Sequence, residues 1–121
     1  VIDDEKSARD LMKRALVKEG FEVHEARNGK IGLTQLHKYS PDLVLLDLMM
    51  PEMDGFEFAE RLRENKEWLN IPVVVITAKD LTKEDHARLK GNVETIMQKG
   101  SYNRNELLSE VTERIKKITE R

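Results

Sequence analysis

The feature that most constrains the fold is a short apolar run, residues 43–46, that ends directly at Asp47. Because the run follows Pro41 and is too short for a free-standing helix, it predicts a strand. It is apolar at every position, so we expect a strand buried on both faces, as in a parallel sheet covered by helices. A carboxylate at the end of such a strand is costly unless a charged group meets it. The surroundings of Asp47 are therefore the main question that the sequence poses.

Strand and helix patterns alternate along the chain. The central strand covers residues 42–46, and further strands are expected at residues 1–2, 21–26, 73–76 and 93–97. Helices follow each strand, and four of the five are expected to begin with a capping pair: Ser7 with Asp10, Asp54 with Glu57, Thr82 with Asp85, and Asn103 with Glu106. Such alternation predicts parallel strands joined by right-handed helical crossovers in a three-layer α/β sandwich. Periodicity does not give the order of the strands.

Length and composition limit the function classes. At 121 residues the chain is expected to form one domain, residues 1–121. Its net charge of −2 argues against a nucleic-acid-binding face, and the absence of cysteine excludes disulfides, thiolate metal sites and a cysteine nucleophile. No apolar run could span a membrane and no signal peptide is visible, so a cytoplasmic location is expected. Because the chain begins at Val1-Ile2 and reaches acidic residues at once, we expect the first strand to be truncated at its N-terminus.

Polar side chains follow four of the five expected strands: Asp3 and Asp4, then Asp47, then Thr77, then Lys99. The carboxyl ends of parallel strands share one edge of a sheet, where ligands bind in open α/β folds. Three carboxylates in a small space repel unless a cation joins them, and hard oxygen ligands suit Mg²⁺ or Mn²⁺. A metal, an ammonium, a hydroxyl and a nucleophilic carboxylate are together the apparatus of phosphoryl transfer.

Each of these residues also has a plainer interpretation. The acidic run that begins at Asp3 is typical of a solvated loop before a helix. A threonine in the position of Thr77 often ends a strand and bonds backbone, and a lysine such as Lys99 usually lies on the surface. Their joint placement around an apolar-flanked Asp47 favours a functional site.

Several stretches resemble the receiver domain of two-component signalling, the phosphoacceptor module of response regulators and hybrid histidine kinases. They cover essentially the whole chain in the order of the family: Val1-Ile2-Asp3-Asp4-Glu5, the run from Pro41 to Gly55 with its Asp-Leu-Met-Met-Pro-x-Met-Asp-Gly motif, Val74-Val75-Ile76-Thr77-Ala78, and Lys99. The resemblance implies a flavodoxin-like fold with a five-stranded parallel sheet of order 2-1-3-4-5 and five helices.

The resemblance also implies roles for individual residues. Asp47 would accept a phosphoryl group from the phosphohistidine of a histidine kinase or of a histidine phosphotransfer domain. Mg²⁺, or Mn²⁺ in its place, would be ligated by Asp4, Asp47 and the backbone carbonyl of Met49, with Asp3 helping through water.

Thr77, Ala78 and Lys99 would contact the phosphoryl group in this family, with Thr77 bonding a phosphoryl oxygen and Lys99 pairing with it. Phosphorylation would shift the surface formed by the fourth helix, the fifth strand and the fifth helix. By the same resemblance, output or kinase domains would neighbour this domain in a longer chain. The domain itself would contact neither nucleic acid nor membrane.

The chain departs from the family pattern at two positions. Gly100 follows the lysine where the family has proline, and glycine can supply unusual backbone angles there. Ile96 stands where the family has a switch aromatic, so an aromatic rotamer change coupled to Thr77 is not expected. The stretch from Gln98 to Tyr102, with the Asn-Glu-Leu-Leu that follows, resembles the receivers of hybrid sensor kinases.

Other functions remain as alternatives. A pseudo-receiver, which binds partners without phosphorylation, is expected to lack an acidic residue or the lysine, and neither is missing here. A metal-dependent aspartyl-phosphate phosphatase needs a second aspartate two residues after the nucleophile, where this chain has Met49. A flavodoxin needs a phosphate-binding loop after the first strand, and none is present. The sequence therefore favours a switch that takes up a phosphoryl group and loses it slowly over an enzyme that turns over substrate.

Overall fold

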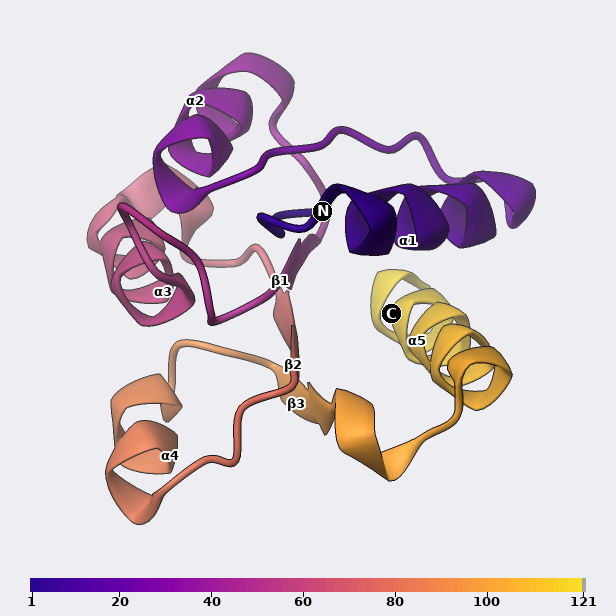
Figure 1. Cartoon of the computed structure of the whole chain (residues 1–121). Helices are drawn as coiled ribbons and strands as arrows, with labels where there is room; N and C mark the ends of the chain where they lie inside the picture. The colour runs from indigo at the N-terminus through magenta and orange to yellow at the C-terminus, as the bar shows by residue number, and fades with distance from the viewer. Residues whose placement is uncertain (121) are drawn as a thin grey trace.

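The computed structural model describes residues 1–120, in which five α-helices alternate with the strands of a parallel sheet (Figure 1). The helices are α1 (Lys6–Lys18), α2 (Gly29–Tyr39), α3 (Gly55–Glu64), α4 (Lys83–Leu89) and α5 (Arg104–Thr119). The strands are β1 (Val44–Leu46), β2 (Val73–Thr77) and β3 (Thr95–Gln98), and two short 3-10 turns are η1 (Lys66–Trp68) and η2 (Lys99–Ser101). None of the described helices combines the length and apolar character that a membrane span requires.

The order of the sheet is the expected one. Strands β1, β2 and β3 pair in parallel in that order. On the free side of β1, Ile2 forms a parallel bridge to Leu46 and a second parallel bridge to Ala26. The order across the sheet is therefore residue 26, residue 2, β1, β2 and β3, which is the flavodoxin-like order 2-1-3-4-5.

Two of the five expected strands are reduced to single bridging residues. Neither residues 1–2 nor residues 21–26 form a continuous ladder, and each contributes one bridge, at Ile2 and Ala26. The reason is that a ladder needs a partner along its whole length. Val1 bonds the backbone of His24 and Ala26, whereas residues 21–23 line a cavity of about 1100 Å³ at the amino-terminal edge of the sheet.

The helices form two layers, one on each face of the sheet (Figure 1). In β1, Val44 and Leu46 pack into the same apolar cluster as residues of α2, α3 and α4. Leu45, between them, packs with residues of α1 and α5 on the other face. Alternate residues of β2 divide in the same way, and all five are buried. The prediction of strands buried on both faces is confirmed.

Local capping signals place most of the helix starts. The capping boxes of Thr82 with Asp85 and of Asn103 with Glu106 are both present, and the Asp54 side chain accepts the N–H of Glu57. The expected cap at Ser7 is wrong. Helix α1 begins two residues earlier than this cap implies, at Lys6 after the N-cap Glu5, and the Ser7 hydroxyl donates to the Glu5 carboxylate at 2.8 Å.

Two glycines allow close packing, whereas Gly100 does not need to be glycine. A Cβ at Gly32 would lie 2.6 Å from Cδ1 of Ile2, and one at Gly55 would lie 2.5 Å from the Asp47 carbonyl oxygen. Gly100 lies in η2 at an ordinary negative φ, and a Cβ there would meet no atom within 4 Å. Gly100 therefore does not use the unusual backbone angles that are open to glycine.

Replacing Gly55 and Gly100 by alanine should have opposite effects on stability. Gly55→Ala forces a Cβ against backbone atoms and should destabilise the fold by about 2–3 kcal/mol. Gly100→Ala should be neutral or stabilise by up to about 1 kcal/mol, because it restricts only the unfolded chain. Urea unfolding of both variants measures the difference, and a Gly55→Ala midpoint equal to that of the unmodified protein would contradict it.

Arg63 holds the loops that lead into β2 and β3. Its Nε and Nη2 donate to the Asn92 carbonyl at 3.0 and 2.9 Å, and its Nη1 donates to the carbonyls of Trp68 and Leu69 at 3.0 and 3.1 Å. One guanidinium thus bonds three backbone carbonyls in two loops at the amino-terminal edge of the sheet. A lysine ammonium lacks the planar fork needed to reach both loops at once.

Arg63→Lys should therefore cost about 1–2 kcal/mol of stability, since partly buried carbonyls lose charged donors. Arg61→Lys is the matched control. Arg61 lies on the same helix and makes an exposed ion pair with Glu57 at 3.8 Å, which contributes about 0.5 kcal/mol or less. Chemical unfolding of the two variants should separate them clearly. Equal losses of stability in the two variants would show that the hydrogen bonds of Arg63 do not stabilise the two loops.

Candidate functional site

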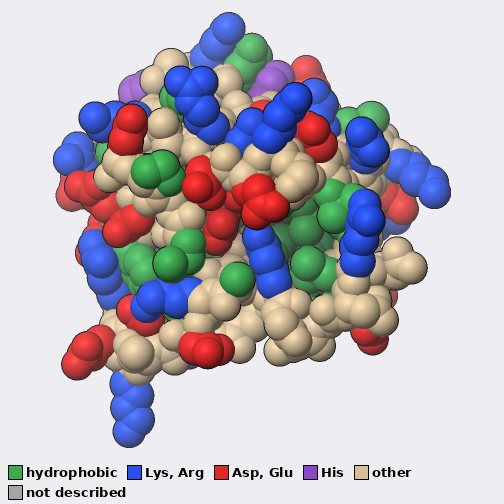
Figure 2. Space-filling model, viewed as in Figure 1, with side chains coloured by type: hydrophobic (Ala, Val, Ile, Leu, Met, Phe, Trp, Pro, Cys, Tyr) green, Lys and Arg blue, Asp and Glu red, His purple; other side chains and the backbone are tan. Residues whose placement is uncertain are grey.

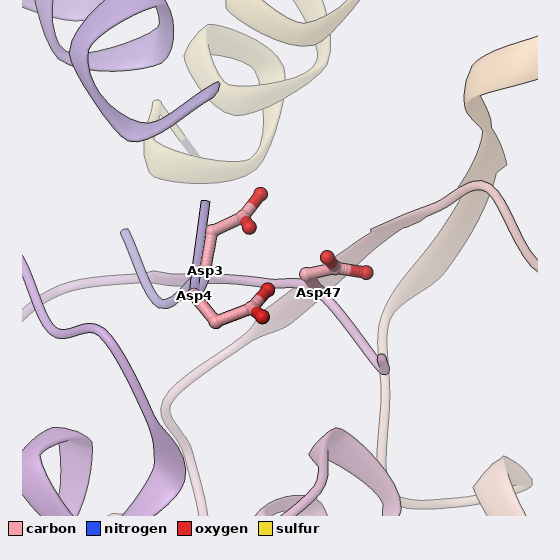
Figure 3. Close-up of side chains that lie close together, drawn as sticks. All are labelled: Asp3, Asp4 and Asp47. Atoms are coloured by element: carbon pink, nitrogen blue, oxygen red, sulfur yellow. The ribbon is translucent and has the colours of Figure 1, made fainter. Parts of the chain in front are cut away.

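The pairing of Ile2 with Leu46 brings two aspartates together. The N–H of Asp47 donates to the Ile2 carbonyl at 2.9 Å, and the next residue on each segment is an aspartate, Asp3 or Asp47. With Asp4, they place three carboxylates whose ligand oxygens lie within 4.8 Å of one another. Figure 3 shows the three side chains projecting into the same space at the end of β1. Acidic side chains also gather near the middle of this face in Figure 2, bordered by basic ones.

The carboxylates differ in burial. Asp3 and Asp47 are 7% and 9% exposed, whereas Asp4 is exposed. Asp3 Oδ1 accepts the N–H of Glu5 at 3.0 Å, and Asp47 Oδ1 accepts the N–H of Met49 at 3.3 Å. These bonds orient the two buried carboxylates without neutralising their charge.

Lys99 supplies one positive charge to the group. It follows β3 directly, and its Nζ lies 3.5 Å from Asp3 Oδ2. One ammonium does not balance three carboxylates. Burial and the nearby Asp3 carboxylate raise the pKa of Asp47 to about 6, although Lys99 opposes the rise. The site therefore carries excess negative charge at neutral pH.

The donor set fits a small hard cation. Two ligands on opposite sides of an octahedral Mg²⁺ are separated by about 4.2 Å, because each Mg–O distance is about 2.1 Å. A spread of 4.8 Å between carboxylate oxygens is close to that value, and the ligands are oxygen atoms. The Met49 carbonyl belongs to the loop at the rim of the site, two residues after Asp47. Mg²⁺ or Mn²⁺ would be the suitable occupant.

The loop from β1 to α3 is fixed by contacts with its surroundings. The N–H of Gly55 donates to the Leu48 carbonyl at 3.1 Å, and the close approach of Gly55 to the Asp47 backbone leaves no room for a side chain. Glu52 has a φ of 65°, in the left-handed region that a side chain makes unfavourable, and its carboxylate accepts a hydrogen bond from Asn28 at 3.4 Å. Met49, 54% exposed, projects from this otherwise anchored loop.

Thr77 lies at the end of β2 and is fully buried. Its hydroxyl accepts the N–H of Lys79 at 3.1 Å. This is the bond to backbone that is expected of an ordinary threonine at a strand end. Because a hydroxyl both donates and accepts, this bond does not use the hydroxyl proton. Ala78 is exposed beside it, and Gln98, the register partner of Thr77 in β3, leads directly to Lys99.

The structure thus brings Asp3, Asp4, Asp47 and Lys99 together, and it places Thr77 at the same edge. Sequence reasoning missed the residues that support them. Arg9 of α1 donates to the Asp3 carbonyl at 2.8 Å and steadies the acidic segment. No periodic pattern marks Arg9, because its contact depends on how the first turn of α1 lies against the acidic segment that precedes it.

Asp47→Asn should change how stability depends on pH. The folded-state pKa of Asp47 is raised to about 6, so between about pH 4 and pH 6 the folded chain binds more protons at this group than the unfolded chain does. Stability contributed by the protonated form is therefore lost as pH rises through about 6. In chelator at pH 8, Asp47→Asn should be more stable than the unmodified protein by about 1 kcal/mol, allowing for solvent screening.

Thermal unfolding at pH 4 to pH 8 tests this difference, which should shrink towards pH 4. Adding MgCl₂ at pH 8 should raise the Tm of the unmodified protein and not that of Asp47→Asn. Asp42→Asn is the control, because Asp42 is exposed and lies two residues before the amino end of β1, away from the carboxylate cluster. If Asp47→Asn and Asp42→Asn gave the same pH profile, the carboxylate repulsion would not limit stability.

Comparisons with known proteins were made on the whole chain. The sequence profile of the response regulator receiver domain matches residues 1–112. The transcriptional regulatory protein SrrA of Staphylococcus aureus is 41% identical over 91 residues, which are 75% of this chain and 35% of that protein. The chain therefore spans about a third of the length of the curated relatives that it matches.

Solved structures agree with the sequence match. The N-terminal domain of a response regulator receiver protein from Methanoculleus marisnigri JR1 is similar with a TM-score of 0.76 and 33% identity, over 94% of this chain and 91% of that one. The Mn²⁺-bound form of response regulator Rcp1 is similar with a TM-score of 0.78 and 26% identity, over 93% of this chain and 86% of that one.

Proposed function

The chain belongs to the response regulator receiver domain family of two-component signalling, and we propose that it accepts a phosphoryl group on Asp47. The observation that carries the proposal is the grouping of three carboxylates with the Lys99 ammonium at the carboxyl edge of the sheet. Asp47 lies at the end of the central strand β1, beside two other carboxylates and the Lys99 ammonium. This arrangement suits a carboxylate nucleophile.

The proposed donor is the phosphohistidine of a histidine kinase or of a histidine phosphotransfer domain. An oxygen of the Asp47 carboxylate forms a bond to phosphorus while the bond from phosphorus to the donor imidazole nitrogen breaks. The imidazole keeps the electron pair and takes up a proton. The Lys99 ammonium would pair with the phosphoryl oxygens, and the Thr77 hydroxyl would donate its proton to one of them, at a site whose rim includes Ala78.

The proposed metal site uses Asp4, Asp47 and the Met49 carbonyl directly, with Asp3 acting through water. A bound Mg²⁺ or Mn²⁺ neutralises negative charge on transferred phosphoryl oxygens. Support comes from the oxygen-only donor set and from the Mn²⁺-bound form of Rcp1, a protein 26% identical to this chain. The excess negative charge around Asp47 gives the site a physical reason to bind a cation.

The proposed output is a change of the surface formed by α4, β3 and α5. Helix α4 is short, and Leu89 is its one buried residue. Little apolar burial therefore holds α4 in place, so a small change at the site can shift it between two positions. We propose that the chain acts as one receiver domain within a longer regulator and that it turns over no substrate beyond slow loss of its own phosphoryl group.

Acetyl phosphate should phosphorylate Asp47. Intact mass after incubation with acetyl phosphate and Mg²⁺ should increase by a single phosphoryl group. The adduct should be absent without Mg²⁺ and in Asp47→Asn, and it should form normally in Asp42→Asn, whose carboxyl lies at the other end of β1. If the folded protein formed no adduct, the proposal would fail and an unphosphorylated pseudo-receiver would be the better interpretation.

A further inference from the structure

Lys79 is bonded to both strands at the carboxyl edge of the sheet. Its N–H donates to the Thr77 hydroxyl at 3.1 Å, at the end of β2. Its carbonyl accepts a hydrogen bond from Nε2 of Gln98 at 3.3 Å, at the end of β3. The backbone of Lys79 therefore cannot move without disturbing at least one of these bonds.

The side chain of Lys79 reaches helix α4. Its ammonium forms an ion pair with Asp85 Oδ2, and the same oxygen accepts the N–H of Thr82 at 3.0 Å in the capping box of α4. The Lys79 ammonium also holds the pKa of Asp85 below its usual range. One carboxylate oxygen therefore joins the start of α4 to the loop that follows Thr77.

Phe56 of α3 supports this ion pair. The Lys79 ammonium lies 5.6 Å from the centre of the Phe56 ring, and the Arg88 guanidinium lies 5.1 Å from it. Arg88 also pairs with Glu60 of α3 at 2.8 Å. Helix α4 is thus held to α3 by one cation–π contact and one ion pair, both made by Arg88. Among these contacts, only the ion pair of Lys79 with Asp85 joins α4 to the Thr77 loop.

We propose that Lys79 connects the Thr77 hydroxyl to helix α4, and that its ion pair with Asp85 holds α4 in the position it takes when Thr77 is not bonded to a phosphoryl group. The inference rests on the proposed function, because it needs a phosphoryl group on Asp47. The Thr77 hydroxyl can turn towards that group and still accept the N–H of Lys79, because this bond leaves the hydroxyl proton free. The backbone of Lys79 then moves with the hydroxyl and pulls on the ion pair at the start of α4.

The connection explains how a chain with Ile96 in the place of a switch aromatic can still couple its site to its surface. Ile96 packs against the apolar cluster under α2, α3 and α4 and offers no polar group to Thr77. The route through Lys79 uses a main-chain bond at one end and a charged pair at the other. Coupling of this kind is reciprocal, so weakening the ion pair should favour phosphoryl binding.

Beryllofluoride, a tetrahedral phosphoryl analogue that binds carboxylates, tests the proposal in the presence of Mg²⁺. Lys79→Met keeps the alkyl chain over Phe56 but removes the charge, and Asp85→Asn keeps an oxygen for the N–H of Thr82. Amide NMR titration should show beryllofluoride binding about three- to tenfold more tightly to both variants than to the unmodified protein. Their α4 amide resonances should already be shifted, before any addition, towards the bound positions.

Glu60→Gln is the matched control. It removes the other ion pair of α4, between Arg88 and Glu60, which has no bond to the Thr77 loop. The beryllofluoride Kd of this variant should stay within about twofold of that of the unmodified protein. Equal tightening in Glu60→Gln, or no tightening in Lys79→Met and Asp85→Asn, would overturn the role of Lys79 while leaving the proposed function intact. Failure of the unmodified protein to bind beryllofluoride would overturn the proposed function and this inference with it.

Discussion

The structure depends on one parallel pairing, that of Ile2 with Leu46. It joins the N-terminal segment to the central strand and, by the geometry of parallel strands, sets the following residues, Asp3 and Asp47, side by side. Apolar burial on both faces of the sheet holds this pairing in place. The same force that packs the strands therefore brings like charges together at their ends. The charged site is a result of how the apolar core is arranged.

Features encoded locally could be predicted from the sequence. Continuous apolar runs gave the strands β1 and β2, and capping pairs gave the starts of α4 and α5, because both depend on neighbouring residues. The strand at residues 21–26 could not be predicted reliably, since an alternating pattern forms a ladder only where a partner lies alongside. The cap at Ser7 failed because Glu5 already starts the helix.

The candidate site divides in the same way. Topology alone predicted that Asp3, Asp47 and Lys99 would share an edge, because strand ends with the same polarity meet there. The supporting contacts could not be predicted. Arg9 bonds the Asp3 carbonyl and Lys79 bonds Asp85, and these contacts depend on the way each helix packs against the sheet. Each of these contacts joins residues six apart, a spacing that matches neither helical nor strand periodicity.

Arg63 has a consequence for how such a chain can change. Its guanidinium bonds loops at the amino-terminal edge of the sheet, whereas the carboxylates lie at the carboxyl edge. These loop contacts and the carboxylates are thus separated by the length of the strands. A substitution in the amino-terminal loops does not touch the carboxylates directly. Sequence changes there can therefore alter stability while the charged site keeps its geometry.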